Sequence, residues 1–181
     1  KGLSIFKRLS LSYLTLSLIV IFMGIYTTWS LDQLNRISSS LSSVDSEVIR
    51  LVNNSRDKFI SQAKFGRKYL VSRDNDFFEQ YIENKDIVYD QLEKIADRLD
   101  GNKKESVFKS LQGNYQEYLT VCRNEFHYIR ENTGSIPYKL EQDKQQLFNE
   151  VISGLDQINE LTKAEMKTKI DTSNSIASQA L

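Results

Sequence analysis

Cysteine, proline and glycine are all scarce in this 181-residue chain. Cys122 is the only cysteine, which excludes a disulfide within the chain and the zinc sites that need several thiolates. Pro137 is the only proline, and seven glycines leave few positions at which the backbone favours a turn. Long helices fit this composition better than many short strands do, so we predict an all-α fold.

An excess of charge of one sign is also missing. The 24 basic and 24 acidic side chains cancel, so no net basic field attracts nucleic acid, and we expect no nucleic-acid partner. His127, the only histidine, follows Cys122 by five residues, which places the two about 140° apart around a helix. We therefore expect a core cysteine, a partly exposed histidine, and no catalytic, metal-binding or cofactor-binding residue in this segment.

One long stretch of the chain has no charge at all. The 23 residues between Arg8 and Asp32 would form a helix of roughly 35 Å, enough to cross a hydrocarbon core of about 30 Å. Lys1, Lys7 and Arg8 precede this stretch, so the positive-inside rule leaves the N-terminus in the cytoplasm. We predict a cytoplasmic N-terminus at 1–9, a transmembrane helix at 10–31 and an exported remainder at 32–181.

A cleaved signal peptide and a buried soluble helix are the alternatives for this stretch. A signal peptide needs a short apolar region followed by small residues at the cleavage site. Here the apolar run is long and ends in Tyr26-Thr27-Thr28-Trp29. Aromatic residues near both ends of the run are typical of the two membrane interfaces, so we favour a retained anchor.

The exported part begins with apolar residues spaced three and four apart from Leu34 to Leu51, which continues the anchor helix outward. Polar residues then interrupt this stripe at Ser55, Lys58 and Gln62. We predict that the packing face shifts there, as in a coiled-coil stutter, and that these three residues form a loose layer where two packings compete. The alternative is that this face meets solvent.

Three clusters of turn residues divide the exported part into helices of about 32–72, 76–100, 103–131 and 136–181. The clusters are SRDND (72–76), DGN (100–102) and NTGSIP (132–137), with Asp76 and Ser135 as predicted helix caps. The first and fourth helices are the longest. This order predicts an up-down-up-down four-helix bundle, preceded by a transmembrane helix that is continuous with the first helix. The first and fourth helices would continue alone toward the membrane beyond the two shorter helices. Because such a two-helix stem is weak alone, we expect a homodimer, with a monomer as the alternative.

Four cations gather near the end of the first predicted helix: Lys64, Arg67, Lys68 and Arg73. Arginine can hold a carboxylate or phosphate with two parallel hydrogen bonds, so this cluster is a candidate ligand site for an anion. The alternative is a solvated rim neutralised by Asp74, Asp76 and Glu79. Aromatic residues are dense at the same end, and we expect most of them in the core.

The segment RKYLVSRDNDFFEQYIENKDIVYDQLEKI (67–95) has a helix that ends in Tyr-Leu, a short polar turn, and an aromatic start to the next helix. Together with the order of the predicted helices over the whole chain, it resembles the extracytoplasmic four-helix-bundle sensor domains of bacterial sensor histidine kinases and chemoreceptors. That resemblance implies a second membrane helix and an output domain beyond Leu181.

The resemblance also implies a function. We expect the signal-input region of a two-component histidine kinase in the bacterial inner membrane, with residues 32–181 in the periplasm. The stimulus, a small molecule or a protein, would act through the first and fourth helices. A chemoreceptor, a membrane-tethered structural bundle and an exported helical enzyme are the alternatives.

Overall fold

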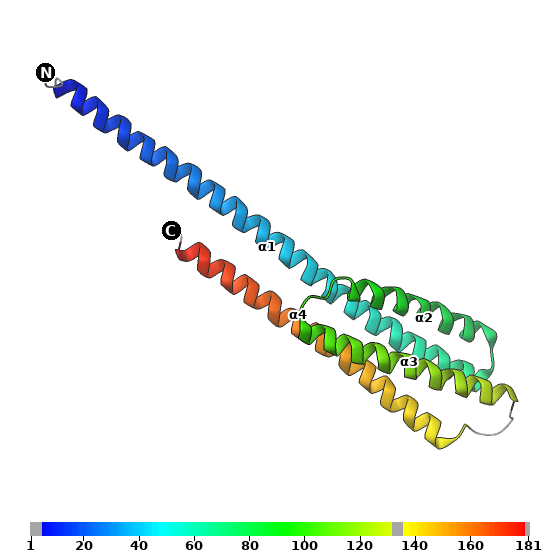
Figure 1. The fold of residues 1–181 in the computed structure, drawn as a ribbon. Helices are drawn as coiled ribbons and strands as arrows, with labels where there is room; N and C mark the ends of the chain where they lie inside the picture. The colour runs from blue at the N-terminus through cyan, green and yellow to red at the C-terminus, as the bar shows by residue number, and fades with distance from the viewer. Residues whose placement is uncertain (1–4, 132–135, 180–181) are drawn as a thin grey trace. The chain divides into compact units, whose positions relative to one another are not determined.

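The computed structural model describes the backbone of residues 5–131 and 136–179, and the side chains of residues 13–29, 44–131, 136–173 and 175. Within these ranges the chain forms four helices and no strand, which confirms the all-α prediction. The helices are α1 (Ile5–Ser72), α2 (Asn75–Ala96), α3 (Asn102–Glu131) and α4 (Tyr138–Gln179) (Figure 1).

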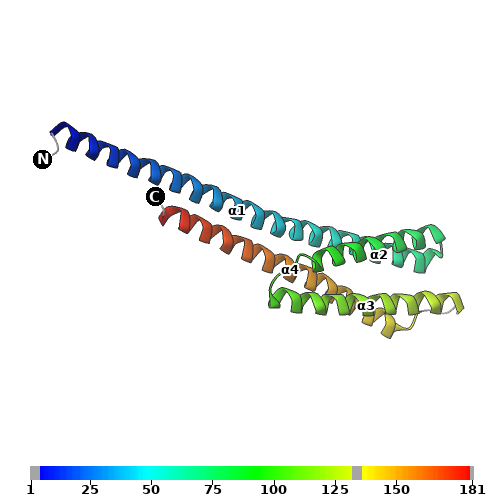
Figure 2. The same cartoon turned by 45° about the horizontal axis from the view of Figure 1, so that its top comes forward.

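The chain divides into two compact units. One consists of residues 43–167, and we call it the bundle; the other combines residues 1–42 with 168–181. In the bundle, successive helices run in opposite directions and lie side by side (Figures 1 and 2). All four helices contribute to one hydrophobic core in the bundle, which is the packing that an up-down-up-down order predicts.

Two of the three polar residues that interrupt the predicted apolar stripe of α1 are buried in the core. Ser55 and Gln62 are both fully buried, at 0% exposure, and they continue the stripe of buried residues with Phe59 between them. Lys58 is only half-buried. Polar side chains therefore occupy two positions of the buried stripe, and α3 supplies a partner for one of them: the Tyr115 hydroxyl donates to Gln62 Oε1 over 3.0 Å.

Aromatic rings fill much of the core, as predicted. Phe59 is fully buried, with ring centroids 5.7 Å from Tyr115, 4.9 Å from Tyr118 and 5.1 Å from Phe148. Nearer the α1–α2 turn, Tyr81 and Phe126 meet edge to face at 5.0 Å. Such contacts stabilise the fold by about 0.5–1.5 kcal/mol each beyond the burial of area.

The turn between α1 and α2 uses different residues from those predicted. α1 ends at Ser72 as expected, and Arg73 takes a left-handed conformation with φ 59° while its N–H donates to the Tyr69 carbonyl over 2.8 Å. The N-cap of α2 is Asp74, whose carboxylate accepts from the Asp76 N–H over 3.0 Å. Asp76 is therefore not the cap, because Asp74 reaches the free N–H groups of the first turn.

Two other helix ends differ from the prediction. α2 ends at Ala96 rather than at residue 100: the Arg98 N–H donates to the Ile95 carbonyl, three residues back, which tightens the last turn, and the chain then turns through Gly101 at φ 98°. α4 begins at Tyr138, with the Pro137 carbonyl accepting from the Leu140 N–H over 2.9 Å. The predicted cap at Ser135 lies outside the described residues.

Replacing Ser55 with alanine should stabilise the bundle by about 1 kcal/mol. Among the described residues, the buried Ser55 hydroxyl oxygen has no hydrogen-bond partner. The folded chain therefore bears the free-energy cost of removing this hydroxyl from water without gaining a hydrogen bond. Urea denaturation followed by circular dichroism measures the change. Ser110→Ala on the exposed face of α3 is the control for helix propensity, and a Ser55→Ala variant less stable than this control would contradict the prediction.

The other unit contains the apolar run of α1. Every side chain described from residue 13 to residue 29 is exposed, including Ile19 at 55% and Phe22 at 67%. Among the described residues, no helix is both long and apolar enough to cross a lipid bilayer. The predicted membrane helix at 10–31 begins and ends among residues whose side chains the structure does not describe.

Candidate functional site

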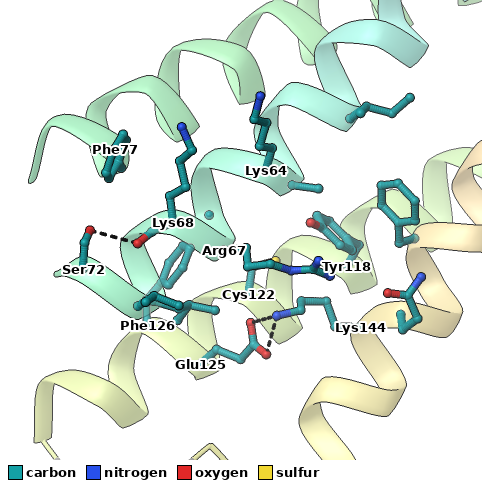
Figure 3. A pocket seen from close by; sticks show the side chains of 17 residues that line it. Lys64, Arg67, Lys68, Ser72, Phe77, Tyr118, Cys122, Glu125, Phe126 and Lys144 are labelled. Carbon is teal, nitrogen blue, oxygen red and sulfur yellow. Dashed lines mark hydrogen bonds and ion pairs between the residues drawn. The ribbon is translucent and has the colours of Figure 1, made fainter. Parts of the chain in front are cut away.

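The bundle contains a cavity of about 840 Å³, within the range of small-molecule sites. Its wall comes from the last turns of α1, the middle of α3 and the first turns of α4, together with Phe77 of α2 (Figure 3). The α1 residues that line it lie between Ile60 and Ser72 and include the consecutive runs 66–68 and 70–72, so they belong to more than one face of that helix.

The wall of the cavity combines apolar rings with a few charges. Phe126 and Phe148 contribute rings, and Ile60 and Leu70 contribute aliphatic surface. The charged residues of the wall are Lys64, Arg67, Lys68, Lys144 and Glu125. A mostly apolar surface with a small number of charged groups is typical of sites that bind small organic molecules.

Three of the four predicted anion-binding residues line this cavity, but the fourth does not. Lys64, Arg67 and Lys68 are part of the wall. Arg73 instead donates a hydrogen bond from Nη1 to the Ile129 carbonyl near the end of α3. The structure therefore does not bring the four cations to one point, because the Arg73 side chain forms a hydrogen bond between the α1–α2 turn and α3.

The three remaining cations point in two directions. Lys64 and Lys68 extend toward α2, and Lys68 Nζ lies 4.8 Å from the centroid of the Phe77 ring (Figure 3). Arg67 extends toward Tyr118 and Lys144 on the other side of the cavity (Figure 3). Only Arg67 of the predicted cluster thus approaches the charges that α3 and α4 contribute.

Those charges form an ion pair that sequence reasoning missed. Lys144 Nζ of α4 lies 2.7 Å from both carboxylate oxygens of Glu125 on α3. The Glu125 side chain is 1% exposed and that of Lys144 is 16% exposed. Burial raises the pKa of Glu125, and the hydrogen bond and charge of Lys144 oppose this shift, with a smaller opposing effect from Arg67.

The position of Glu125 in the sequence did contain a signal. It lies three residues after Cys122 and directly before Phe126, next to the apolar residues of α3, where a charged side chain is almost never fully buried unless a partner accompanies it. Its partner comes from another helix, 19 residues further along the chain. Spacing along one helix cannot identify such a partner.

Cys122 and His127 lie as predicted, on different faces of α3. Cys122 is 3% exposed and belongs to the core, whereas the His127 side chain is 69% exposed, with Nε2 3.3 Å from Glu131 Oε2. Among the described residues, no group of three histidine, cysteine, aspartate or glutamate side chains is placed to hold a metal ion.

The Cys122 thiol should react slowly in the folded chain. Burial raises the pKa of Cys122 to about 11, so at pH 8 its thiolate fraction is about 200-fold below that of a free cysteine. Since the chain has one cysteine, the reaction with an aromatic disulfide reagent reports on this residue alone. We expect a slow reaction in buffer and a fast one in concentrated urea; similar rates in both would contradict the burial of this thiol.

Comparisons of the chain with protein-family models, with curated proteins and with solved structures found no match.

Proposed function

We propose that this chain is the extracytoplasmic input region of a bacterial transmembrane sensor histidine kinase, with residues 10–31 anchored in the inner membrane. One observation carries the proposal: α1 holds both an apolar run whose described side chains are all exposed and the residues that line the bundle cavity. A helix that joins a lipid-facing surface to a ligand cavity is suited to passing a signal between them.

The exposure of the apolar run supports the anchor. Soluble monomers rarely expose contiguous apolar patches of more than a few hundred Å². From residue 13 to residue 29, large apolar side chains such as Leu16, Ile19 and Phe22 remain more than half exposed around the helix. Contact with lipid acyl chains would remove this surface from water, at a gain of about 25 cal/mol per Å².

The position of the cavity supports the signalling role. Arg67 of α1 and Lys144 and Phe148 of α4 belong to the same wall, so a bound molecule would contact both long helices. A ligand that binds one arrangement of these helices more tightly than another shifts the population toward the first. A homodimer would transmit the shift to a paired output domain.

A reporter fusion tests the proposed topology. Alkaline phosphatase, which is active only after export, is fused after Leu181 in the full chain and in a variant that lacks residues 10–31. We expect phosphatase activity in the first fusion and none in the second. An inactive first fusion, or equal activity in both, would overturn the proposed anchor.

The output is tested by reading the gene beyond codon 181. A second apolar run of about 20 residues, followed by a histidine-containing dimerisation helix and an ATPase domain, supports the kinase. A long heptad hairpin in that place would support a chemoreceptor instead. A stop codon would contradict both and leave the membrane-tethered structural bundle.

A further inference from the structure

We propose that the bundle cavity binds a small aromatic carboxylate, with its carboxylate between Arg67 and Lys144 and its ring among the aromatic side chains of the wall. That such a molecule is the stimulus rests on the proposed function. Its binding to the cavity rests on the charges, rings and size of the cavity alone.

The charges of the wall favour an anion. The wall contains four cations, Lys64, Arg67, Lys68 and Lys144, and a single carboxylate, and of the four only Arg67 and Lys144 extend toward that carboxylate. That carboxylate, Glu125, already accepts two hydrogen bonds from Lys144. The cavity therefore has more positive than negative charge before any ligand enters.

Arg67 is the cation best placed for this role. It points into the cavity toward Lys144 (Figure 3). In the part of the chain that the structure describes, no carboxylate forms an ion pair with Arg67, and the charge of Arg67 lowers the pKa of Glu125 only from a distance. A guanidinium offers two parallel N–H donors to a carboxylate, which is a stronger interaction than a single neutral hydrogen bond.

The ligand's carboxylate would lie close to that of Glu125, which sets a geometric condition. Two of the donors of Lys144 face Glu125, and Lys144 has three. The ligand can therefore receive one hydrogen bond from Lys144 and two from Arg67 without breaking the buried pair. The two cations offset the repulsion between the two carboxylates.

The apolar part of the wall favours an aromatic body. Phe126, Phe148 and Tyr118 come from α3 and α4, and Phe77 closes the side toward α2. Ring pairs at centroid distances of about 4.5–7 Å add about 0.5–1.5 kcal/mol to the burial of area. A cavity of about 840 Å³ has room for one ring, its acid group and water.

Calorimetric titration of the full chain tests the proposal with three probes: phenylacetate, phenylacetamide and acetate. Phenylacetamide has the ring without the charge, and acetate has the charge without the ring. We expect saturable binding of phenylacetate and at least about tenfold weaker binding of the other two. No saturation by phenylacetate up to about 10 mM, or binding of acetate with equal affinity, would overturn the proposal.

Three substitutions assign the binding to the cavity. Arg67→Gln removes the proposed anion contact from an exposed position and should weaken phenylacetate binding at least about tenfold. Arg123→Gln and Lys109→Gln, both exposed on α3 and outside the wall of the cavity, should each change it less than about threefold. Equal affinities for wild type and Arg67→Gln would overturn the assignment, and circular dichroism verifies that each variant is folded.

The binding and topology experiments fail independently. Lost export with intact phenylacetate binding would remove the sensor proposal and leave the cavity site. Intact export without phenylacetate binding would remove the cavity site and leave the sensor proposal.

Discussion

Replacing Lys144 with methionine should lower the free energy of unfolding at pH 7 by about 3 kcal/mol. The substitution keeps the volume of the side chain but leaves the Glu125 carboxylate, at 1% exposure, without the cation that lies 2.7 Å from both its oxygens. An unpaired buried charge costs far more than the pair itself contributes. Urea denaturation of the two chains measures the difference.

A double substitution separates the pair from simple loss of packing. Glu125→Met combined with Lys144→Met removes both charges and should recover most of the stability lost in the single variant, because two apolar side chains can pack beside Cys122 and Phe126. Equal losses in the single and double variants would contradict the argument. Lys163→Met is the control, since the pair of Lys163 with Glu160 is exposed and should contribute less than about 0.5 kcal/mol.

The cost of Lys144→Met should also depend on pH. Because burial raises the pKa of Glu125, the folded chain holds a proton at pH values where the unfolded chain has lost it. The contribution of Glu125 to stability therefore falls as the pH rises from the ordinary pKa of a glutamate through the raised pKa of Glu125 in the folded chain. Removing Lys144 raises this pKa further, so the variant should approach wild-type stability as the pH is lowered toward about 4.5. A difference independent of pH would contradict this.

Arginine at both Ile19 and Phe22 should remove the chain from the membrane. In the proposed anchor these positions lie near the centre of the 10–31 span, where each arginine costs about 3 kcal/mol, or about 6 kcal/mol together. Carbonate extraction of membranes should recover wild type in the pellet and the variant in the supernatant. The phosphatase fusion after Leu181 should lose its activity in parallel.

A matched pair of substitutions in the bundle controls for charge and for loss of apolar surface. Val71 is 83% exposed and Tyr138 is 78% exposed, and both lie in the bundle. Val71→Arg combined with Tyr138→Arg should leave the chain in the membrane pellet. If Ile19→Arg with Phe22→Arg stays in the pellet as well, residues 10–31 are not the anchor.

Local signals in the sequence determined the helices of this protein. The scarcity of proline and glycine predicted an all-α fold, the turn cluster at 72–76 placed the end of α1 at Ser72, and Cys122 was expected in the core, where it lies. Each of these features depends on residues within a few positions of one another, where backbone geometry and side-chain periodicity act directly.

Only the tertiary structure decided which polar side chains belong inside. In the sequence, Ser55 and Gln62 interrupt the apolar stripe, yet both side chains are fully buried. Gln62 accepts a hydrogen bond from Tyr115, 53 residues away. Arg73 donates to Ile129, 56 residues away. The sequence could place the cations near one end of α1, but whether a polar group is buried and paired depends on a partner from another helix, which no spacing within one helix encodes.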